Sequence, residues 1–391
     1  MRITGLQATP VAVPFRRDER WAFGSRRGMV SVLLKVSTDE GIVGIGEASA
    51  YPSADIVLAV IKSVESFALG EDPFRIEHIM KRINVAGTWH HVKSTSPGIA
   101  AVEMACWDIV GKACNQPLVN LMGGRVRDAV DFFYYVGQGS PDAVAEDARD
   151  GRKQGFKTFY LKVASDDFGA DLARLEALRD AVGPDALLRV DANEAWSPGA
   201  AVRAVREMER FGLELVEQPV SGRNLAEMAY VRQRIDTPLL ANEASWTRYD
   251  QLEVIRYGAA DVLSVDNQMD GGLLNLKRSA GLCEVAGLPV LKHSLGELAV
   301  GVAAATQVMA ATPNFLYASQ SYASFLDDDV VTGGPLTCQD GALAVPTGPG
   351  LGVTLDDDRV ARYAELYERE GRDFAFQDPA LHARTPLLPK R

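Results

Sequence analysis

Residues 187–243 read LLRVDANEAWSPGAAVRAVREMERFGLELVEQPVSGRNLAEMAYVRQRIDTPLLANE, and three apolar runs in this stretch each lead to an acidic residue. Asp191, Glu217 and Glu243 are evenly spaced, each 26 residues after the one before. A carboxylate at the end of a buried strand is costly unless it is paired or bound to a metal. Because the spacing suits one strand plus one helix, the stretch predicts a single site assembled from several strands.

The same alternation of apolar runs and helical patterns extends over the chain from about residue 126. The apolar runs lie near residues 130–136, 156–163, 187–190, 213–216, 238–241, 262–265, 288–291 and 314–318. Eight strands with seven helices between them predict an α/β fold with a parallel (β/α) barrel. A doubly wound sheet is the alternative, but the turn Gly137–Pro141 after the first strand lacks the GxGxxG pattern of a nucleotide-binding sheet.

The first part of the chain has a different pattern, in which runs of strands precede runs of helices. Such an order is typical of an α+β domain. We therefore expect an α+β capping domain over residues 1–125, the catalytic barrel over residues 126–325, and a segment over residues 326–391 that returns to the capping domain.

Composition excludes several classes of protein. Acidic residues outnumber basic ones, 52 against 41, and no basic block is present, which disfavours nucleic-acid binding. The apolar stretch 298–311 is too short and too polar to span a membrane. Four scattered cysteines and the lack of an apolar leader at the N-terminus favour free thiols and a cytoplasmic location.

Polar residues follow the other strands as well. Because the carboxyl ends of barrel strands share one face, six polar residues are expected to surround one mouth of the barrel. They are Lys162, Asp191, Glu217, Glu243, Asp266 and His293. Three adjacent carboxylates repel one another, and a divalent cation removes that repulsion; all-oxygen ligation favours Mg²⁺, with Mn²⁺ as the alternative. Such a cation can hold a substrate carboxylate while a base removes the α-proton. Lys162 and His293 are the candidate bases, and Asp266 is placed to orient the imidazole.

Longer motifs carry a resemblance to the mandelate racemase and muconate lactonising enzyme branch of the enolase superfamily. The motifs are GIVGIGEASAYPS (41–53), AAVEMACWDIVGKACNQPLVNLMGG (100–124), YLK (160–162), VDAN (190–193), VEQP (216–219), NE (242–243), VDNQMDGG (265–272) and KHS (292–294). The resemblance implies that Asp191, Glu217 and Glu243 are the metal ligands. It also implies that Lys162 is one base, that His293 with Asp266 is the other, and that Asn193 contacts substrate.

Three departures from the family pattern stand out. Tyr160 occupies the position where the first lysine of a KxK motif is common, and it could donate a hydrogen bond to substrate. Asn242 precedes Glu243 and is an alternative third ligand, although the spacing favours Glu243. Gln320 stands after the eighth strand, where an acidic residue is common, and it can bind substrate without supplying charge.

Capping loops are expected to set specificity. Trp21 and Arg26 are placed in a loop between the early strands, and Tyr51 follows a strand end. The leading expectation is Mg²⁺-dependent dehydration of a hydroxylated sugar acid. The alternatives are a racemase or epimerase, a lactone cycloisomerase on the same scaffold and, more distantly, a non-catalytic binding protein. The expected partner is a small carboxylate substrate, and the resemblance implies a homo-oligomer.

Overall fold

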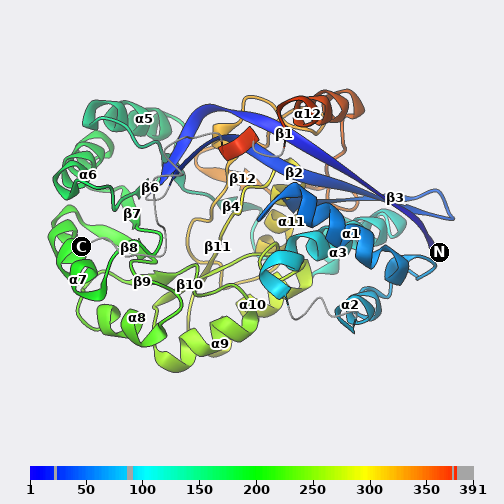
Figure 1. The fold of residues 1–391 in the computed structure, drawn as a ribbon, viewed down its shortest axis with the longest axis horizontal. Coiled ribbons are helices and arrows are strands. Elements are labelled where there is room, and N and C mark those ends of the chain that lie inside the picture. The colour runs from blue at the N-terminus through cyan, green and yellow to red at the C-terminus, as the bar shows by residue number, and fades with distance from the viewer. Residues whose placement is uncertain (22–23, 86–90, 372–373, 377–391) are drawn as a thin grey trace.

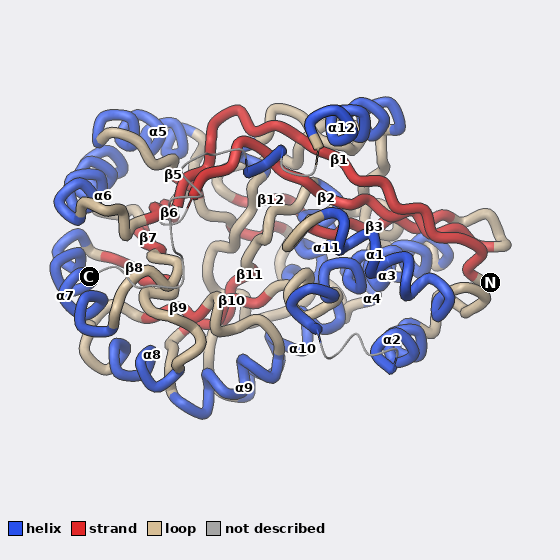
Figure 2. Tube along the Cα trace, viewed as in Figure 1, coloured by secondary structure: helices blue, strands red, loops and turns tan. Residues whose placement is uncertain are grey.

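A seven-stranded parallel sheet forms the centre of the larger part of the molecule (Figures 1 and 2). The computed structural model describes residues 1–21, 24–85, 91–371 and 374–376. The sheet has the strand order β11-β10-β9-β8-β7-β6-β5. Its strands are β5 (Tyr134–Val136), β6 (Thr158–Lys162), β7 (Leu187–Asp191), β8 (Leu213–Glu217), β9 (Leu239–Ala241), β10 (Val262–Val265) and β11 (Val290–Lys292). The consecutive order of parallel neighbours confirms the predicted barrel and excludes the doubly wound alternative, in which the strand order reverses.

Helices follow the strands and surround the sheet (Figure 1). They are α5 (Pro141–Lys153), α6 (Phe168–Val182), α7 (Pro198–Met208), α8 (Leu225–Arg232), α9 (Arg248–Tyr257), α10 (Leu273–Val285) and α11 (Ala299–Ala310). The start of α5 shows why the boundary is readable from sequence: the Ser140 hydroxyl accepts a bond from the Ala143 N–H (3.3 Å), and Pro141 occupies the first turn. Gly258 ends α9 in the left-handed conformation with φ 57°.

The eighth predicted strand is absent as a regular strand, which corrects the sequence-based prediction. Residues 314–318 make only an isolated bridge, Phe315 to Val290, and the next residue, Ser319, bridges to Phe132. The reason is that arginine side chains donate hydrogen bonds to carbonyl oxygens in and beside this segment, which a neighbouring strand would otherwise use. Arg127 donates to the carbonyl oxygens of Pro313 (2.7 Å) and Phe315. Arg189 donates to that of Ala318 (2.6 Å).

The first predicted strand of the barrel is divided in two. Its first half, β4 (Ala129–Asp131), pairs antiparallel with β12 (Ala342–Ala344) instead of continuing the parallel sheet, and its second half is β5. Short helical segments are spread over the described part of the chain. They are α4 (Leu118–Leu121) and the 3₁₀ turns η2 (Glu209–Phe211), η3 (Ala323–Phe325) and η4 (Phe374–Phe376).

An antiparallel sheet of three strands forms the N-terminal part, as expected. Its strands are β1 (Ile3–Trp21), β2 (Gly24–Thr38) and β3 (Val43–Ser49), in that order. Three helices follow: α1 (Ala54–Ala68), α2 (Ile76–Val85) and α3 (Val92–Ala113). Strands β1 and β2 include Trp21 and Arg26, which the sequence placed in a loop, and Glu19 and Arg26 form an ion pair that is largely buried.

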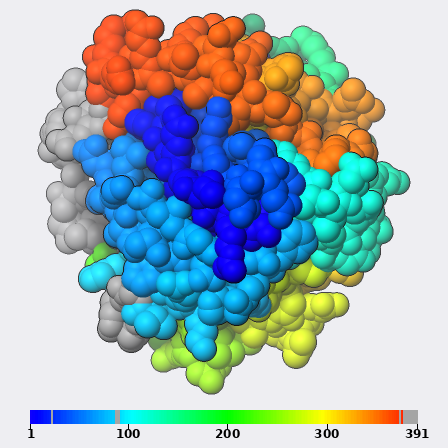
Figure 3. All heavy atoms as spheres, turned by 90° about the vertical axis from the view of Figure 1, so that its right-hand side faces the viewer, coloured from blue at the N-terminus to red at the C-terminus, as the bar shows by residue number. Residues whose placement is uncertain are grey.

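The C-terminal helix α12 (Asp357–Glu370) packs against β1, and Lys35 of β2 pairs with Asp357 (2.7 Å). Figure 3 shows the blue N-terminal residues bordered by this orange and red segment. Residues 377–391 of the expected returning segment lie outside the described residues.

Helix α11 lies between the two parts of the molecule and is buried along its whole length. It contacts β3 on the N-terminal side and α10 on the barrel side. This location accounts for the Ala-rich apolar stretch around residues 298–311. Within the described residues, no helix is long and apolar enough to cross a bilayer.

Close packing of β3 on α3 gives a first testable prediction. A Cβ added to Gly46 would lie 2.1 Å from the carbonyl oxygen of Ala101, a backbone atom that cannot move aside. We expect Gly46→Ala to lower the free energy of unfolding by about 1–3 kcal/mol, measured by chemical denaturation. Gly5→Ala on β1 is the matched control, because a Cβ there meets no atom within 4 Å. Equal stabilities of the two variants would contradict the packing described here.

Candidate active site

Two of the predicted site residues, from well-separated strands, line one cavity of about 310 Å³. Lys162, the last residue of β6, and His293, which directly follows β11, both line it. Four strands, β7 to β10, separate β6 from β11 in the sheet. The carboxyl ends of parallel strands meet at one face of a barrel, which explains how residues 131 positions apart in sequence share this cavity.

The Lys162 ammonium is held by residues at the end of the neighbouring strand. Its Nζ lies 2.5 Å from Asp191 Oδ2 and donates to Asn193 Oδ1 at 2.7 Å. Burial disfavours the charged form, but the Asp191 and Glu217 carboxylates outweigh burial and raise the pKa of Lys162. Lys162 can therefore act as a base only when the charges of Asp191 and Glu217 are neutralised.

The carboxylates of Asp191 and Glu217 lie side by side, because the two residues are paired in the register of β7 and β8. Burial, together with the charge of Asp191, raises the pKa of Glu217 well above its ordinary value. Burial raises the pKa of Glu243 to about 8, with Asp191 again contributing. The cluster is thus destabilised by its own negative charge, which is the condition that a bound cation relieves.

The chemistry of these donors fits Mg²⁺, although the side chains do not converge as a finished cage. Among the described residues no three acidic, His or Cys side chains lie close enough to hold an ion as they stand. Asp191 is engaged instead by Lys162, by the Tyr160 hydroxyl and by the Asn193 N–H (2.7 Å). Glu243 Oε2 is buried and has no hydrogen-bond partner, so an oxygen donor is available for a cation.

Asn242 and Glu243 both line the cavity, so both positions for a third ligand stay open. Asn242 Oδ1 is buried without a hydrogen-bond partner, as is Glu243 Oε2. Glu243 Oε1 accepts a bond from Asn193 Nδ2 at 2.9 Å. Asn193 consequently links the Lys162 ammonium to Glu243, and it also lines the cavity.

His293 and Asp266 are brought together as predicted from their places after neighbouring strands. His293 Nδ1 lies 3.2 Å from Asp266 Oδ2, and the His293 N–H donates to the Val265 carbonyl at 2.9 Å. Asp266 is buried behind the imidazole and is not among the residues that line the cavity. The carboxylate is therefore placed to fix the ring orientation and not to meet substrate.

Tyr160 and Gln320 are not among the residues that line the cavity. The buried Tyr160 hydroxyl donates to Asp191. Gln320 Oε1 accepts from the Ser294 N–H at 3.2 Å, beside His293. Both residues therefore contact groups of the site, and their hydrogen bonds to a substrate stay a prediction.

The capping residues Trp21, Arg26 and Tyr51 line the cavity, but two of them come from strands instead of from the expected loop. Trp21 ends β1, and Arg26 lies near the start of β2. Arg26 forms a buried ion pair with Glu19, and its guanidinium lies 4.5 Å from the centre of the Tyr322 ring. The ion pair allows these two charged side chains to be largely buried beside the cavity.

Sequence reasoning missed several lining residues. They are Glu19, Glu194, Trp246, Met269, Ser294, Leu295 and Tyr322. Glu194 and Ser294 directly follow predicted site residues, so their places after strands were a usable signal. Glu19 had none, because its burial depends on Arg26 and on hydroxyl bonds from Tyr135 and Tyr322, both 2.8 Å.

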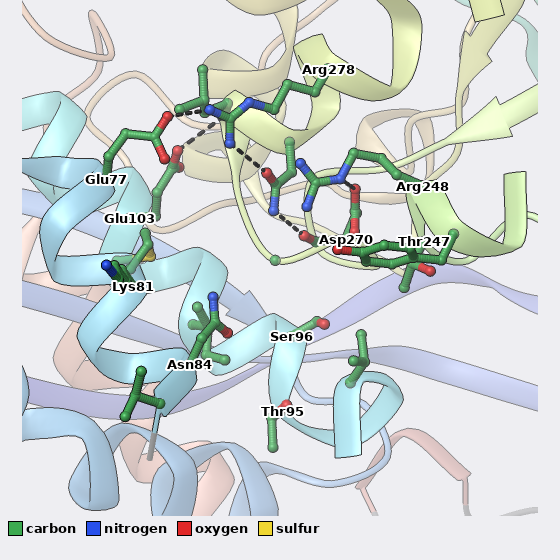
Figure 4. A pocket seen from close by; sticks show the side chains of 18 residues that line it. Glu77, Lys81, Asn84, Thr95, Ser96, Glu103, Thr247, Arg248, Asp270 and Arg278 are labelled. Atoms are coloured by element: carbon green, nitrogen blue, oxygen red, sulfur yellow. Dashed lines mark hydrogen bonds and ion pairs between the residues drawn. The ribbon is translucent and has the colours of Figure 1, made fainter. Parts of the chain in front are cut away.

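A second cavity of about 780 Å³ lies between the N-terminal helices and the barrel helices (Figure 4). Ion pairs cross or line it, namely Arg278 with Glu77 and Arg248 with Asp270 (2.9 Å). Neither Lys162 nor His293 lines it, so both predicted bases lie at the smaller cavity.

Comparisons with known proteins agree with this geometry. Residues 4–123 match the family described as "Mandelate racemase / muconate lactonizing enzyme, N-terminal domain", and residues 143–359 match "Enolase C-terminal domain-like". L-Ala-D/L-Glu epimerase of Bacillus subtilis is 33% identical over 90% of this chain and 97% of the relative. A chloromuconate cycloisomerase of Cupriavidus pinatubonensis is 30% identical over 90% of this chain and 96% of the relative.

A solved structure shows the same architecture. The dipeptide epimerase of Enterococcus faecalis, in complex with Mg and the dipeptide L-Leu-L-Tyr, superposes with a TM-score of 0.85 at 29% identity. The match covers 90% of this chain and all of that one, 100%.

Proposed function

The chain belongs to the mandelate racemase and muconate lactonizing enzyme family of the enolase superfamily, and from this premise we propose that it catalyses 1,1-proton transfer at the carbon α to a carboxylate. Family membership makes it an enzyme of the class that removes such a proton with the help of Mg²⁺. The finer assignment, racemisation or epimerisation, depends on the placement of two bases.

The observation that carries the proposal is that Lys162 and His293 face one cavity from well-separated strands. Inversion at a carbon requires that one group removes the proton from one face and another returns a proton to the opposite face. A single base suffices for elimination or for ring opening. Two candidate bases in one cavity therefore support inversion over reactions that use only one.

Each base has partners suited to its task. Asp266 holds the His293 ring through Nδ1 and leaves Nε2 as the atom that exchanges a proton. Lys162 lies between Asp191 and Asn193, which fix its Nζ. Asp191, Glu217 and Glu243 or Asn242 would hold Mg²⁺, which supplies charge to stabilise the developing dianion and to neutralise the carboxylates beside Lys162.

We propose as substrate a small amino-acid derivative with a free carboxylate, such as a dipeptide or an N-acylamino acid. The cavity volume lies at the lower end of the range for small-molecule sites, roughly 300–1,000 Å³. Aromatic side chains line it, with the rings of Tyr51 and Trp246 5.9 Å apart, and they offer an apolar surface to a side chain. The relatives named above include epimerases of L-Ala-D/L-Glu and of a dipeptide.

Dehydration of a sugar acid, the leading expectation from sequence, is less well supported than this alternative. The similar proteins are epimerases and cycloisomerases. The described cavity also places aromatic rings, and not only polar groups, around the space where a polyhydroxylated chain would lie.

Exchange of the α-proton tests the proposal. Incubating the protein with Mg²⁺ and a library of dipeptides and N-acylamino acids in D2O is expected to give α-deuterated substrate and both epimers, measured by NMR and chiral chromatography. A set of sugar acids and a muconolactone serve as controls. Formation of a 2-keto acid or a ring-opened product, without any epimerised member of the library, would replace this proposal by dehydration or cycloisomerisation.

A further inference from the structure

Strand β3 of the N-terminal part contacts both loops that carry the His293–Asp266 pair. One loop follows β10 and contains Asp266 and Gln268. The other runs from His293 to the start of α11. These contacts are made by side chains that the proposed reaction does not otherwise use.

Gln268 joins the first loop to the backbone of β3. Its Oε1 accepts from the Ser49 N–H at 3.2 Å, and its Nε2 donates to the Glu47 carbonyl at 2.8 Å. The buried amide thus pairs with β3 much as a neighbouring strand would. The Gln268 backbone N–H in turn donates to Asp266 Oδ1 at 2.5 Å, and the other oxygen of Asp266 faces His293.

Glu47 fixes the second loop at its far end. Its carboxylate is buried and accepts from the N–H groups of Leu298 (2.7 Å) and Gly301 (2.8 Å), at the N-terminus of α11. Negative charge at the positive end of a helix is favourable there. The Ser49 hydroxyl adds a bond to the Gly296 carbonyl at 3.0 Å. The loop that begins with His293 is therefore held from β3 at Gly296 and at Leu298.

Among the described residues, the other base, Lys162, has no hydrogen bond to β3. Lys162 is held by Asp191 and Asn193, and its carbonyl accepts from Gln138 Nε2 at 2.7 Å. All of these partners lie in the barrel. Hydrogen bonds from β3 thus support the His293 half, whereas the N-terminal part acts on Lys162 through the charge of Glu19 on β1.

We infer that Gln268 and Glu47 are positioning residues for the His293 half of proton transfer, through which β3 sets the orientation of the His293–Asp266 pair. This inference rests on the proposed two-base function. It assigns to the N-terminal part a role in holding one base, in addition to covering the cavity.

Removing the contacts of Gln268 or Glu47 is expected to slow α-proton exchange for one isomer of the substrate and not for the other. Gln268→Met removes both side-chain bonds to β3 at nearly constant length, and Glu47→Gln replaces one acceptor of the α11 cap. Each is expected to slow exchange of the isomer whose α-proton faces His293 by about 10- to 100-fold, the size of effect known for partners that orient metal ligands. Exchange of the opposite isomer and Mg²⁺ affinity are expected to stay nearly unchanged.

Asp108→Asn is the matched control for a general loss of stability. Asp108 is also buried and also binds β3, since it accepts from the Ile45 N–H at 2.9 Å, but its other partners are Lys112 and the Leu351 N–H. Within the described residues, Asp108 has no hydrogen bond to either of the two loops that carry Asp266 and His293. We expect the control to lower the melting temperature and to leave the ratio of the two exchange rates unchanged.

A spectroscopic readout makes the test independent of turnover. The ¹⁵N signals of the His293 ring, identified by their loss in His293→Asn, are expected to shift in Gln268→Met and to stay in place in Asp108→Asn. Equal slowing of both isomers, or unchanged exchange with an unchanged His293 signal, would overturn the inference. If His293→Asn and Lys162→Ala themselves fail to separate the two isomers, the proposed function fails, and the His293 signal alone then decides the positioning role.

Discussion

Replacing Glu217 by glutamine is expected to abolish tight Mg²⁺ binding and turnover together while leaving the fold intact. Glu217 is buried, and burial together with Asp191 raises its pKa well above the ordinary value. Removing its charge relieves this repulsion, so the metal-free variant is expected to melt at or above the temperature of the metal-free parent. Its Mg²⁺ affinity is expected to fall by more than about 100-fold, since even outer-shell partners of a metal are worth about 10- to 100-fold.

Calorimetric titration with Mg²⁺ alone measures this effect without any substrate. Glu253→Gln, an exposed change on α9, controls for loss of a surface charge. Unchanged affinity in Glu217→Gln would remove Glu217 from the ligand set. The same titration on Asn242→Ala and Glu243→Gln identifies the third ligand, because the variant that loses the ligand is expected to lose affinity to a similar extent.

Substitution of the two bases is expected to separate the two directions of proton transfer. In His293→Asn, the isomer whose α-proton faces Lys162 is still expected to exchange with D2O, with retention of configuration. The opposite isomer is expected to exchange more slowly by roughly 10²- to 10⁴-fold, the usual contribution of a positioned acid or base. Lys162→Ala is expected to show the reverse preference, and neither variant should interconvert the isomers at an appreciable rate.

Proton NMR of each separate isomer in D2O measures these rates. Mg²⁺ affinity is measured beside them, because Lys162 also pairs with Asp191 and its removal changes the charge near the cation. Loss of exchange from the same isomer in both variants would mean that the two residues act on one face, and the two-base proposal would then be wrong.

The residues at strand ends were predictable because a parallel barrel converts sequence spacing into spatial order. Asp191 and Glu217 are paired in register on β7 and β8, as their equal spacing suggested. The approach of His293 to Asp266 was predictable for the same reason, because β10 and β11 are neighbours. Local patterns were also sufficient for most of the helices, whose boundaries follow from caps such as Ser140 and Gly258.

Other features could not be read locally because they depend on distant partners. The stretch 314–318 has the composition of a strand, yet Arg127 donates to the Phe315 carbonyl and Arg189 to the Ala318 carbonyl. The sequence placed Arg26 in a loop, yet it lies in β2 and pairs with Glu19, which also accepts from the hydroxyls of Tyr135 and Tyr322. In both cases side chains that lie far away in the sequence changed the outcome.

By itself, the sequence determined the parallel barrel, the order of its polar strand ends and the kind of cation that they suit, since periodicity and residue chemistry act over one strand and one helix. Only the tertiary structure decided which oxygens of these residues are already engaged, as Asp191 is by Tyr160 and Lys162. It alone also showed that Gln320 lies behind Ser294 and that Glu47 reaches the N-terminus of α11. The physical reason is that hydrogen bonds between residues far apart in sequence form only once packing brings the two parts of the chain together.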